Sequence, residues 1–221
     1  MKYSALITAG GTGNRVGLKY NKILLDICGK KVIDYSFDYF KNDGNCSEII
    51  CVVNKKDYEY FINEYQNDNI TFVIGGESRQ QSVYNGLNKV RSDYVLIHDS
   101  ARPYINAEKV EYLLKQLHNE KAVSLAIPVT DTTIVHHGNR FVKALNRNTL
   151  LAIQTPQGFH TNIIKDAHAL AVKNDYKATD DTDLVAQFTK YKPYYVNGDN
   201  RSIKLTTKLD IEILKVILCL E

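Results

Sequence analysis

The stretch "LITAGGTGNRVG" (residues 6–17) is an apolar run that passes directly into a loop with four glycines and one arginine. A Walker phosphate-binding loop requires Gly-Lys-Ser/Thr after its glycines, and no such triplet follows here. A dinucleotide-binding fingerprint requires Gly-x-Gly-x-x-Gly, but from Gly11 the pattern runs to Gly13 and then to Val16. The stretch therefore predicts a buried strand followed by an anion-binding loop of neither familiar kind.

Outward from this stretch, short β-branched runs alternate with segments that carry apolar residues at helical spacing. We expect strands at 3–8, 48–53, 70–75, 93–99 and 122–129, and helices at 30–43, 56–68, 78–90 and 106–121. This alternation predicts an α/β fold: a Rossmann-like, mostly parallel sheet with helices on both faces. Ligands bind beyond the carboxyl ends of such strands, so residues 10–17, 75–79 and 99–102 should converge on one site.

Residues 130–150 interrupt the alternation. There "HGN" separates two β-type runs, which predicts a β-hairpin that projects from the sheet. After it we expect helices at 161–174, 181–191 and 208–220, and strands at 193–199 and 202–207. We expect residues 1–221 to form a single domain, with the projecting β-arm at about 132–153.

Composition narrows the class of protein. The chain has 28 basic and 25 acidic residues with no Lys/Arg run, which argues against a nucleic-acid-binding surface. No signal peptide or apolar span of about 20 residues is present, so we expect a cytoplasmic protein that does not bind membranes. The four cysteines form no Cys-x-x-Cys pair, and we expect all of them to be reduced, mostly buried thiols: Cys28, Cys46, Cys51 and Cys219.

A series of short motifs runs along nearly the whole chain: "TAGGTGNRVG…NK" (8–22), "GGESRQQSVYNGL" (75–87), "HDSARP" (98–103), "PVTDT" (128–132), "QTPQGF" (154–159), "TDDTDLV" (179–185) and "SIKLTT" (202–207). In this order they resemble the cytidylyltransferases that activate sugar-alcohol phosphates. The similarity is greatest to the 2-C-methyl-D-erythritol 4-phosphate cytidylyltransferase family of isoprenoid precursor synthesis. The ribitol-5-phosphate cytidylyltransferases are close relatives, but "PVTDT", "SVYNGL" and "LNRNTLLAIQTPQGF" favour the methylerythritol branch.

The resemblance implies a reaction in which CTP and a polyol phosphate give a CDP-polyol and pyrophosphate. Because one phosphate attacks another, catalysis needs positioning and electrostatic stabilisation and no protein nucleophile. The family pattern implies that Arg15 and Lys22 stabilise the transition state at the α-phosphate, while Lys204 binds the phosphates from the opposite side. It also implies that the loop backbone holds the triphosphate, at Ala9, Gly10, Gly11 and Gly13.

Asp99 ends an expected buried strand and is the predicted ligand of the cofactor, Mg²⁺; the alternative is a turn or helix-capping aspartate. His98 is expected to be a structural, hydrogen-bonded histidine. Arg102 either pairs locally or contacts the ligand. The remaining nucleotide-binding candidates resemble the family's cytidine pocket: Gly76, Glu77, Arg79, Ser82 and Ser100. Because that pocket is small and lined by glycines, we expect CTP to be used and ATP to be rejected.

In the family the arm crosses to a second subunit and helps to form its polyol-phosphate site, so a homodimer is implied. Family members often carry a threonine in the arm and an arginine just after the "TPQ-F" segment. This chain has Ala144 and Thr161 at or near those places, and Arg140, Lys143 and Arg147 are possible substitutes.

One further residue differs from the family pattern, and the sequence leaves two other classes of protein open. Asn21 stands where the family commonly has a proline, which questions the rigidity of the loop before Lys22. An NAD-dependent dehydrogenase is a competing interpretation, but the third glycine is missing and the second strand ends in Asn54 where an acidic residue is needed. A non-catalytic nucleotide-binding module would not require Arg15, Lys22 and Lys204 together.

Overall fold

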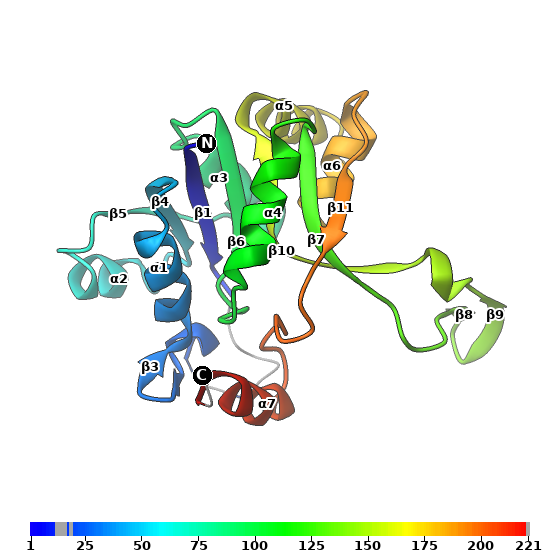
Figure 1. Ribbon diagram of the computed structural model, residues 1–221, viewed down its shortest axis with the longest axis horizontal. Helices are drawn as coiled ribbons and strands as arrows, with labels where there is room; N and C mark the ends of the chain where they lie inside the picture. The colour runs from blue at the N-terminus through cyan, green and yellow to red at the C-terminus, as the bar shows by residue number, and fades with distance from the viewer. Residues whose placement is uncertain (12–16, 18–19, 220–221) are drawn as a thin grey trace.

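The computed structural model of the chain describes residues 1–11, 17 and 20–219, so the predictions for Gly13 and Arg15 lie outside the described residues. A seven-stranded sheet forms its centre, in the order β11-β7-β10-β6-β1-β4-β5 (Figure 1). The strands are β1 (Tyr3–Ala9), β4 (Cys46–Val53), β5 (Ile70–Ile74), β6 (Tyr94–Asp99), β7 (Ala122–Pro128), β10 (Leu151–His160) and β11 (Tyr194–Asn197). All are parallel except β10, which runs antiparallel to β6 and β7.

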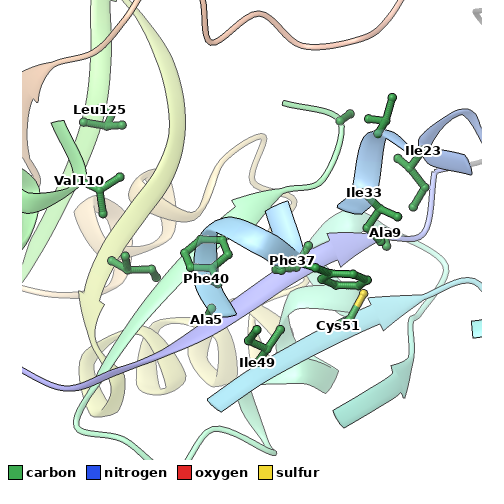
Figure 2. Close-up of a cluster of buried hydrophobic side chains, with 14 of the residues drawn as sticks. Ala5, Ala9, Ile23, Ile33, Phe37, Phe40, Ile49, Cys51, Val110 and Leu125 are labelled. Atoms are coloured by element: carbon green, nitrogen blue, oxygen red, sulfur yellow. The ribbon is translucent and has the colours of Figure 1, made fainter. Parts of the chain in front are cut away.

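Helices cover both faces of the sheet, as the sequence predicts. They are α1 (Val32–Asn42), α2 (Tyr58–Glu64), α3 (Arg79–Leu87), α4 (Ala107–Leu117), α5 (Thr161–Lys173), α6 (Asp181–Phe188) and α7 (Lys208–Cys219). Because side chains alternate along a strand, Ile7 of β1 packs with α1, α2 and α4, whereas Leu6 packs with α3, α5 and α6. Figure 2 shows the first cluster, in which Phe37 and Phe40 of α1 lie over β1 and β4. Burial on both faces explains the nearly continuous apolar runs of the central strands.

One strand of the sheet was not predicted, and one predicted strand does not form. The sequence did not predict β10, because "LAIQTPQGFH" contains Pro156 and Gly158, which are unfavourable inside a strand. The register of β10 on β7 shifts between Ile153 and Gln157, and the Thr155–Pro156 peptide bond is cis. Residues 202–207, predicted as a strand, form no strand but a loop. Within that loop the Leu205 amide donates to the Ala101 carbonyl, at 2.8 Å.

The hairpin prediction is confirmed. Strands β8 (Ile134–His137) and β9 (Arg140–Ala144) pair antiparallel and project from the body of the molecule (Figure 1). Gly138 in their turn has φ of 56°, a conformation that favours glycine. A short 3-10 helix, η3 (Arg147–Thr149), leads from the arm towards β10. Apolar side chains of the arm are exposed to solvent, Phe141 at 66% and Val142 at 54%.

The expectation of four reduced cysteines is wrong for one pair. Cys28 and Cys219 form a disulfide, with Cα atoms 5.6 Å apart, while Cys46 and Cys51 are free. The two partners are 191 residues apart in sequence and meet because α7 packs against β2 (Asp26–Ile27), which pairs with β3 (Lys30–Lys31). Of the described helices, none is long and apolar enough to cross a membrane.

Candidate active site

Loops that are far apart in the sequence meet at the carboxyl end of the parallel strands, as the sequence predicts. They enclose a cavity of about 290 Å³. Its walls come from the β1 loop, the loop before α3, the end of β6 and the loop before α7. The lining residues are Thr8, Gly10, Gly11, Lys22, Ile23, Gly76, Glu77, Ser78, Arg79, Ser82, Asp99, Ser100, Ala101 and Lys204.

Asp99, the last residue of β6, lies at the centre of the charges in this cavity. One carboxylate oxygen, Oδ1, accepts from Arg79 Nε at 3.1 Å and from Thr8 Oγ1 at 3.1 Å. The other, Oδ2, accepts from Lys204 Nζ at 2.5 Å. Burial would raise the pKa of Asp99, but the charges of Arg79 and Lys204 outweigh it and hold that pKa well below its usual range. Asp99 is therefore a carboxylate at neutral pH.

Arg79 is the first residue of α3 and joins two carboxylates. The helix begins here because the side chain of Ser78 caps it, accepting from the Gln81 amide at 3.1 Å. Besides Asp99, the guanidinium donates from Nη1 to Asp181 Oδ2 at 2.7 Å. Burial alone would lower the pKa of Arg79, but the charges of Asp181 and Asp99 raise it. Arg79 is thus a fixed cation in the wall of the cavity.

Two lysines from opposite ends of the chain form another wall. Lys22 lies in a 3-10 helix, η2 (Lys22–Leu24), and is only 7% exposed. Its Nζ donates to the Leu205 carbonyl at 2.5 Å, and Leu205 directly follows Lys204 in the sequence. Lys22 and Lys204 both line the cavity, so the structure brings together the two described residues of the predicted catalytic set.

Asn21 holds the segment before Lys22 in place. Its Nδ2 donates to the Ala9 carbonyl at 2.9 Å and to Asp57 Oδ2 at 3.0 Å. Its Oδ1 accepts from the Ile23 amide and caps η2. These bonds supply the restraint that a proline at this position would otherwise provide. They also occupy the carbonyl of Ala9, which, unlike the other described nucleotide-binding candidates, does not line the cavity.

The predicted cytidine pocket is built around Gly76. Its amide donates to Ser82 Oγ at 3.1 Å, and that hydroxyl in turn donates to the Ser78 carbonyl at 2.8 Å. A Cβ on Gly76 would lie 2.3 Å from Cγ of Gln81, so a side chain there would displace this neighbour. Across the cavity, Ser100 Oγ donates to the Thr8 carbonyl at 2.7 Å and fixes the end of β6 against β1.

His98 and Arg102 have structural contacts in this region. His98 is fully buried; its Nε2 donates to the Arg102 carbonyl and its Nδ1 accepts from Thr155 Oγ1, both at 3.1 Å. Burial lowers the pKa of His98 to about 4, so the ring is neutral at pH 7. The guanidinium of Arg102 donates to the carbonyls of Ser202, at 2.6 Å, and Ile153, at 3.3 Å. Of its two predicted roles, the structure shows the local one.

The residues considered for the acceptor phosphate do not line this cavity. Thr161 follows β10 at the opposite end of the sheet, where its Oγ1 donates to the Ser92 carbonyl at 2.8 Å. Arg140, Lys143 and Ala144 lie on the exposed arm strand β9, and Arg147 donates to the Thr130 carbonyl at 3.0 Å.

Sequence reasoning missed several residues here. Thr8 is one of them, and the alternation of side chains along β1 is the only signal of its direction. Asp181 is another; it lies in "TDDTDLV", at the start of α6. The residue before it, Asp180, caps this helix, and its side chain accepts from the Thr182 amide at 2.8 Å.

Comparisons with known proteins agree with this geometry. The family model of 2-C-methyl-D-erythritol 4-phosphate cytidylyltransferase matches residues 3–219. The enzyme of that name from Clostridioides difficile is 36% identical over 225 residues, 99% of this chain and 94% of the relative. The one from Caldanaerobacter subterraneus is 37% identical over 226 residues, 99% of each chain.

Solved structures show the same similarity. The 4-diphosphocytidyl-2C-methyl-D-erythritol synthase of Anaerococcus prevotii superposes with a TM-score of 0.86 at 29% identity, covering 99% of this chain and 96% of that one. The 2-C-methyl-D-erythritol 4-phosphate cytidylyltransferase of Francisella tularensis gives 0.86 at 27% identity, covering 99% and 100%. The match over nearly the full length shows that this chain belongs to the 2-C-methyl-D-erythritol 4-phosphate cytidylyltransferase family.

Proposed function

We propose that this chain transfers the cytidylyl group of CTP to 2-C-methyl-D-erythritol 4-phosphate. An oxygen of the acceptor phosphate attacks the α-phosphorus of CTP, and the bond from that phosphorus to the leaving pyrophosphate breaks. The observation that carries the proposal is the set of three cations, Lys22, Arg79 and Lys204, that line one cavity at the carboxyl edge of the sheet. Family membership supports the same reaction.

The cations perform the electrostatic part of this reaction. The acceptor phosphate, the α-phosphate and the leaving pyrophosphate share one small space in the transition state, and fixed positive charges offset the charge that develops there. We assign Lys22, which is buried, lines the cavity and donates to the Leu205 carbonyl, to the α-phosphate. The exposed backbone of Gly10 and Gly11 permits close approach of the triphosphate. Arg15 remains a prediction as the second group at the α-phosphate.

Asp99 is the residue we assign to Mg²⁺. In the part of the chain that the structure describes, no three acidic, histidine or cysteine side chains group as a metal site. The single carboxylate of Asp99 still fits Mg²⁺, because this ion is usually held by one or two carboxylates together with substrate phosphates and water. When bound, the ion supplies charge to the phosphate oxygens. Asp99 is ionised, and its oxygens accept from Arg79, Thr8 and Lys204, so the ion would replace one of these partners when it binds together with the phosphates.

The segment from Gly76 to Ser82, which includes the first turn of α3, is the proposed binding site for the cytosine and ribose. Backbone forms the wall at Gly76, without a side chain, which suits a small pyrimidine. The amides of Gly76 and Glu77 donate to Ser82 Oγ and Gln81 Oε1, at 3.1 and 3.0 Å, and the base would compete with these side chains for them. The Gln81 side chain lies where a Cβ on Gly76 would be, so the packing favours glycine at this position. We therefore expect purine nucleotides to be excluded.

The arm is the proposed dimer contact of a single nucleotidyltransferase domain. An isolated two-stranded ribbon is marginally stable in water, and this one exposes Phe141 and Val142. A second copy across a two-fold axis would cover these side chains. In that arrangement Arg140, Lys143 or Arg147 would supply positive charge to the acceptor phosphate of the partner, because none of them lines the cavity of its own chain.

The test is release of pyrophosphate by the purified protein with Mg²⁺, 2-C-methyl-D-erythritol 4-phosphate and either CTP, ATP or GTP. We expect release with CTP and at least a hundredfold less with either purine, and Lys22→Ala should abolish most of it. Equal rates with ATP would contradict the cytidine assignment. Release that needs no polyol phosphate would contradict the transfer reaction.

A further inference from the structure

A buried carboxylate lies behind Arg79 and is not used in the reaction described so far. Asp181 is 1% exposed and does not line the cavity. Its Oδ2 accepts from Arg79 Nη1 at 2.7 Å, and its Oδ1 accepts from His168 Nε2 at 3.2 Å. His168 is fully buried. A series of contacts therefore leads from the interior, through Asp181 and Arg79, to Asp99 at the cavity.

Three helices fix this series of contacts. Arg79 begins α3, His168 lies in the middle of α5, and Asp181 begins α6. The His168 ring stacks on Tyr84 of α3, with ring centroids 5.9 Å apart and planes 9° apart. Gln80, next to Arg79, donates to the Tyr176 carbonyl and accepts from the Ala178 amide, both at 3.0 Å, just before α6. The position of Asp181 relative to Arg79 is thus restrained from both sides.

The two cations on Asp99 are held very differently. The Arg79 guanidinium uses one edge for Asp99 and a second for the buried Asp181. Lys204 donates to Asp99 from a loop. Its side chain is 36% exposed, close to the 30% of Arg79, so the difference lies in the buried second partner of Arg79. When a triphosphate enters, both cations face a new anion. Arg79 keeps a partner that solvent cannot reach, whereas Lys204 can exchange Asp99 for a phosphate oxygen.

We propose that Asp181, oriented by His168, is a positioning residue that keeps Arg79 in place, so that Lys204 is the cation that turns from Asp99 to the substrate phosphates. This inference rests on the proposed function of the cavity. A guanidinium has five N–H donors, and these two ion pairs use two of them, so donors remain for phosphate oxygens. Without the charge of Asp181, Asp99 would be the remaining carboxylate partner of Arg79 in this series. The guanidinium would then be free to move with the Asp99 side chain.

The test compares Asp181→Asn with Asp183→Asn. Both variants remove one carboxylate from the first turn of α6, but Asp183 contacts the Tyr176 hydroxyl and not Arg79. CTP binding is measured by titration calorimetry without metal, and kcat and KM by pyrophosphate release. We expect Asp181→Asn to weaken CTP binding and lower kcat, each by about ten- to a hundredfold, the range of a lost charge-assisted hydrogen bond. We expect Asp183→Asn to stay within about twofold of the wild type on both measures.

Two further variants separate positioning from folding. Asp181→Glu keeps the charge and should recover part of the loss, and the double variant Asp181→Asn/Arg79→Gln should be no worse than Arg79→Gln alone. If Asp181→Asn does not fold, His168→Phe, which keeps the stacked ring and removes the Nε2 donor, should show a smaller loss in the same direction.

The results that would contradict the positioning role differ from those that would contradict the proposed function. A folded Asp181→Asn within twofold of the wild type, or losses that add to those of Arg79→Gln, would overturn the positioning role while leaving the reaction intact. His168→Phe with unchanged binding and kcat would do the same where Asp181→Asn does not fold. A wild-type protein that neither binds CTP nor releases pyrophosphate would overturn the proposed function as well.

Discussion

Replacing Asp99 by asparagine keeps the size of the side chain and removes its charge. In the wild type one oxygen accepts from Arg79 and Thr8, each at 3.1 Å, and the other from Lys204 at 2.5 Å. An asparagine must turn an NH₂ group towards one of these donors, so at least one charge-assisted hydrogen bond is lost. Both stability and activity should therefore fall.

The loss of stability follows from what each cation retains. Arg79 keeps Asp181, and Lys204 is about a third exposed and can turn to water, so the full cost of an unpaired buried charge does not apply. A hydrogen bond to a charged group contributes about 1.5–3 kcal/mol, and we expect a decrease of about 2–3 kcal/mol in the free energy of unfolding. For a domain of this size that lowers the Tm by roughly 4–12 °C. The kcat should fall about a hundredfold or more, the range for a group that acts on developing charge.

The pH dependence of the stability difference distinguishes the loss of the Asp99 charge from a general loss of packing. The pKa of Asp99 is depressed in the folded protein, so its contribution is fully present above the unfolded value of about 4 and is lost as the pH falls towards the folded value. The difference between wild type and Asp99→Asn should be constant between pH 5 and 7. Below about pH 4 it should narrow by roughly 1.4 kcal/mol per pH unit. Urea unfolding at pH 7 and pH 3 measures it, and a difference as large at pH 3 as at pH 7 would refute the reasoning.

Four other substitutions test separate parts of the protein. Arg15→Lys and Lys22→Arg should each lower kcat about 10²–10³-fold with a smaller change in KM for CTP, because these contacts act in the transition state; raised KM with normal kcat in steady-state assays would make the loop a binding element only. Phe141→Asp on the arm should give a monomer at micromolar concentration by light scattering, with reduced activity, and a fully active monomer would rule out a shared site. Gly86→Ala should lower the free energy of unfolding by about 1–2 kcal/mol despite the better helix propensity of alanine, because its Cβ would lie 2.6 Å from Cγ2 of Val52; an unchanged urea midpoint would show that α3 can shift to admit it.

The sequence was sufficient for the parts of the fold that follow from periodicity. Strand and helix alternation predicts a parallel sheet, and a parallel sheet places the ends of β1 and β6 at one edge. This is why Gly10 and Asp99, nearly ninety residues apart, were expected together and do line one cavity. The arm was likewise visible from two β-type runs around Gly138.

Features that depend on tertiary contacts were not visible in the sequence. Strand β10 contains Pro156 and Gly158, and only its place between β6 and β7 makes it a strand. The Cys28–Cys219 disulfide depends on how α7 packs, which no local spacing encodes. Asp181 resembles any acidic residue at a helix start until α3 brings Arg79 against it.

The most direct measurement of the central claim is a competition between acceptors. The protein is given CTP and Mg²⁺ with equal concentrations of 2-C-methyl-D-erythritol 4-phosphate and D-ribitol 5-phosphate, and both CDP-polyols are quantified by mass spectrometry during the first turnovers. We predict that the methylerythritol product exceeds the ribitol product at least a hundredfold, since a site that hydrogen-bonds one polyol leaves polar groups unpaired with the other. Equal amounts of the two products, or an excess of the ribitol product, would contradict the account.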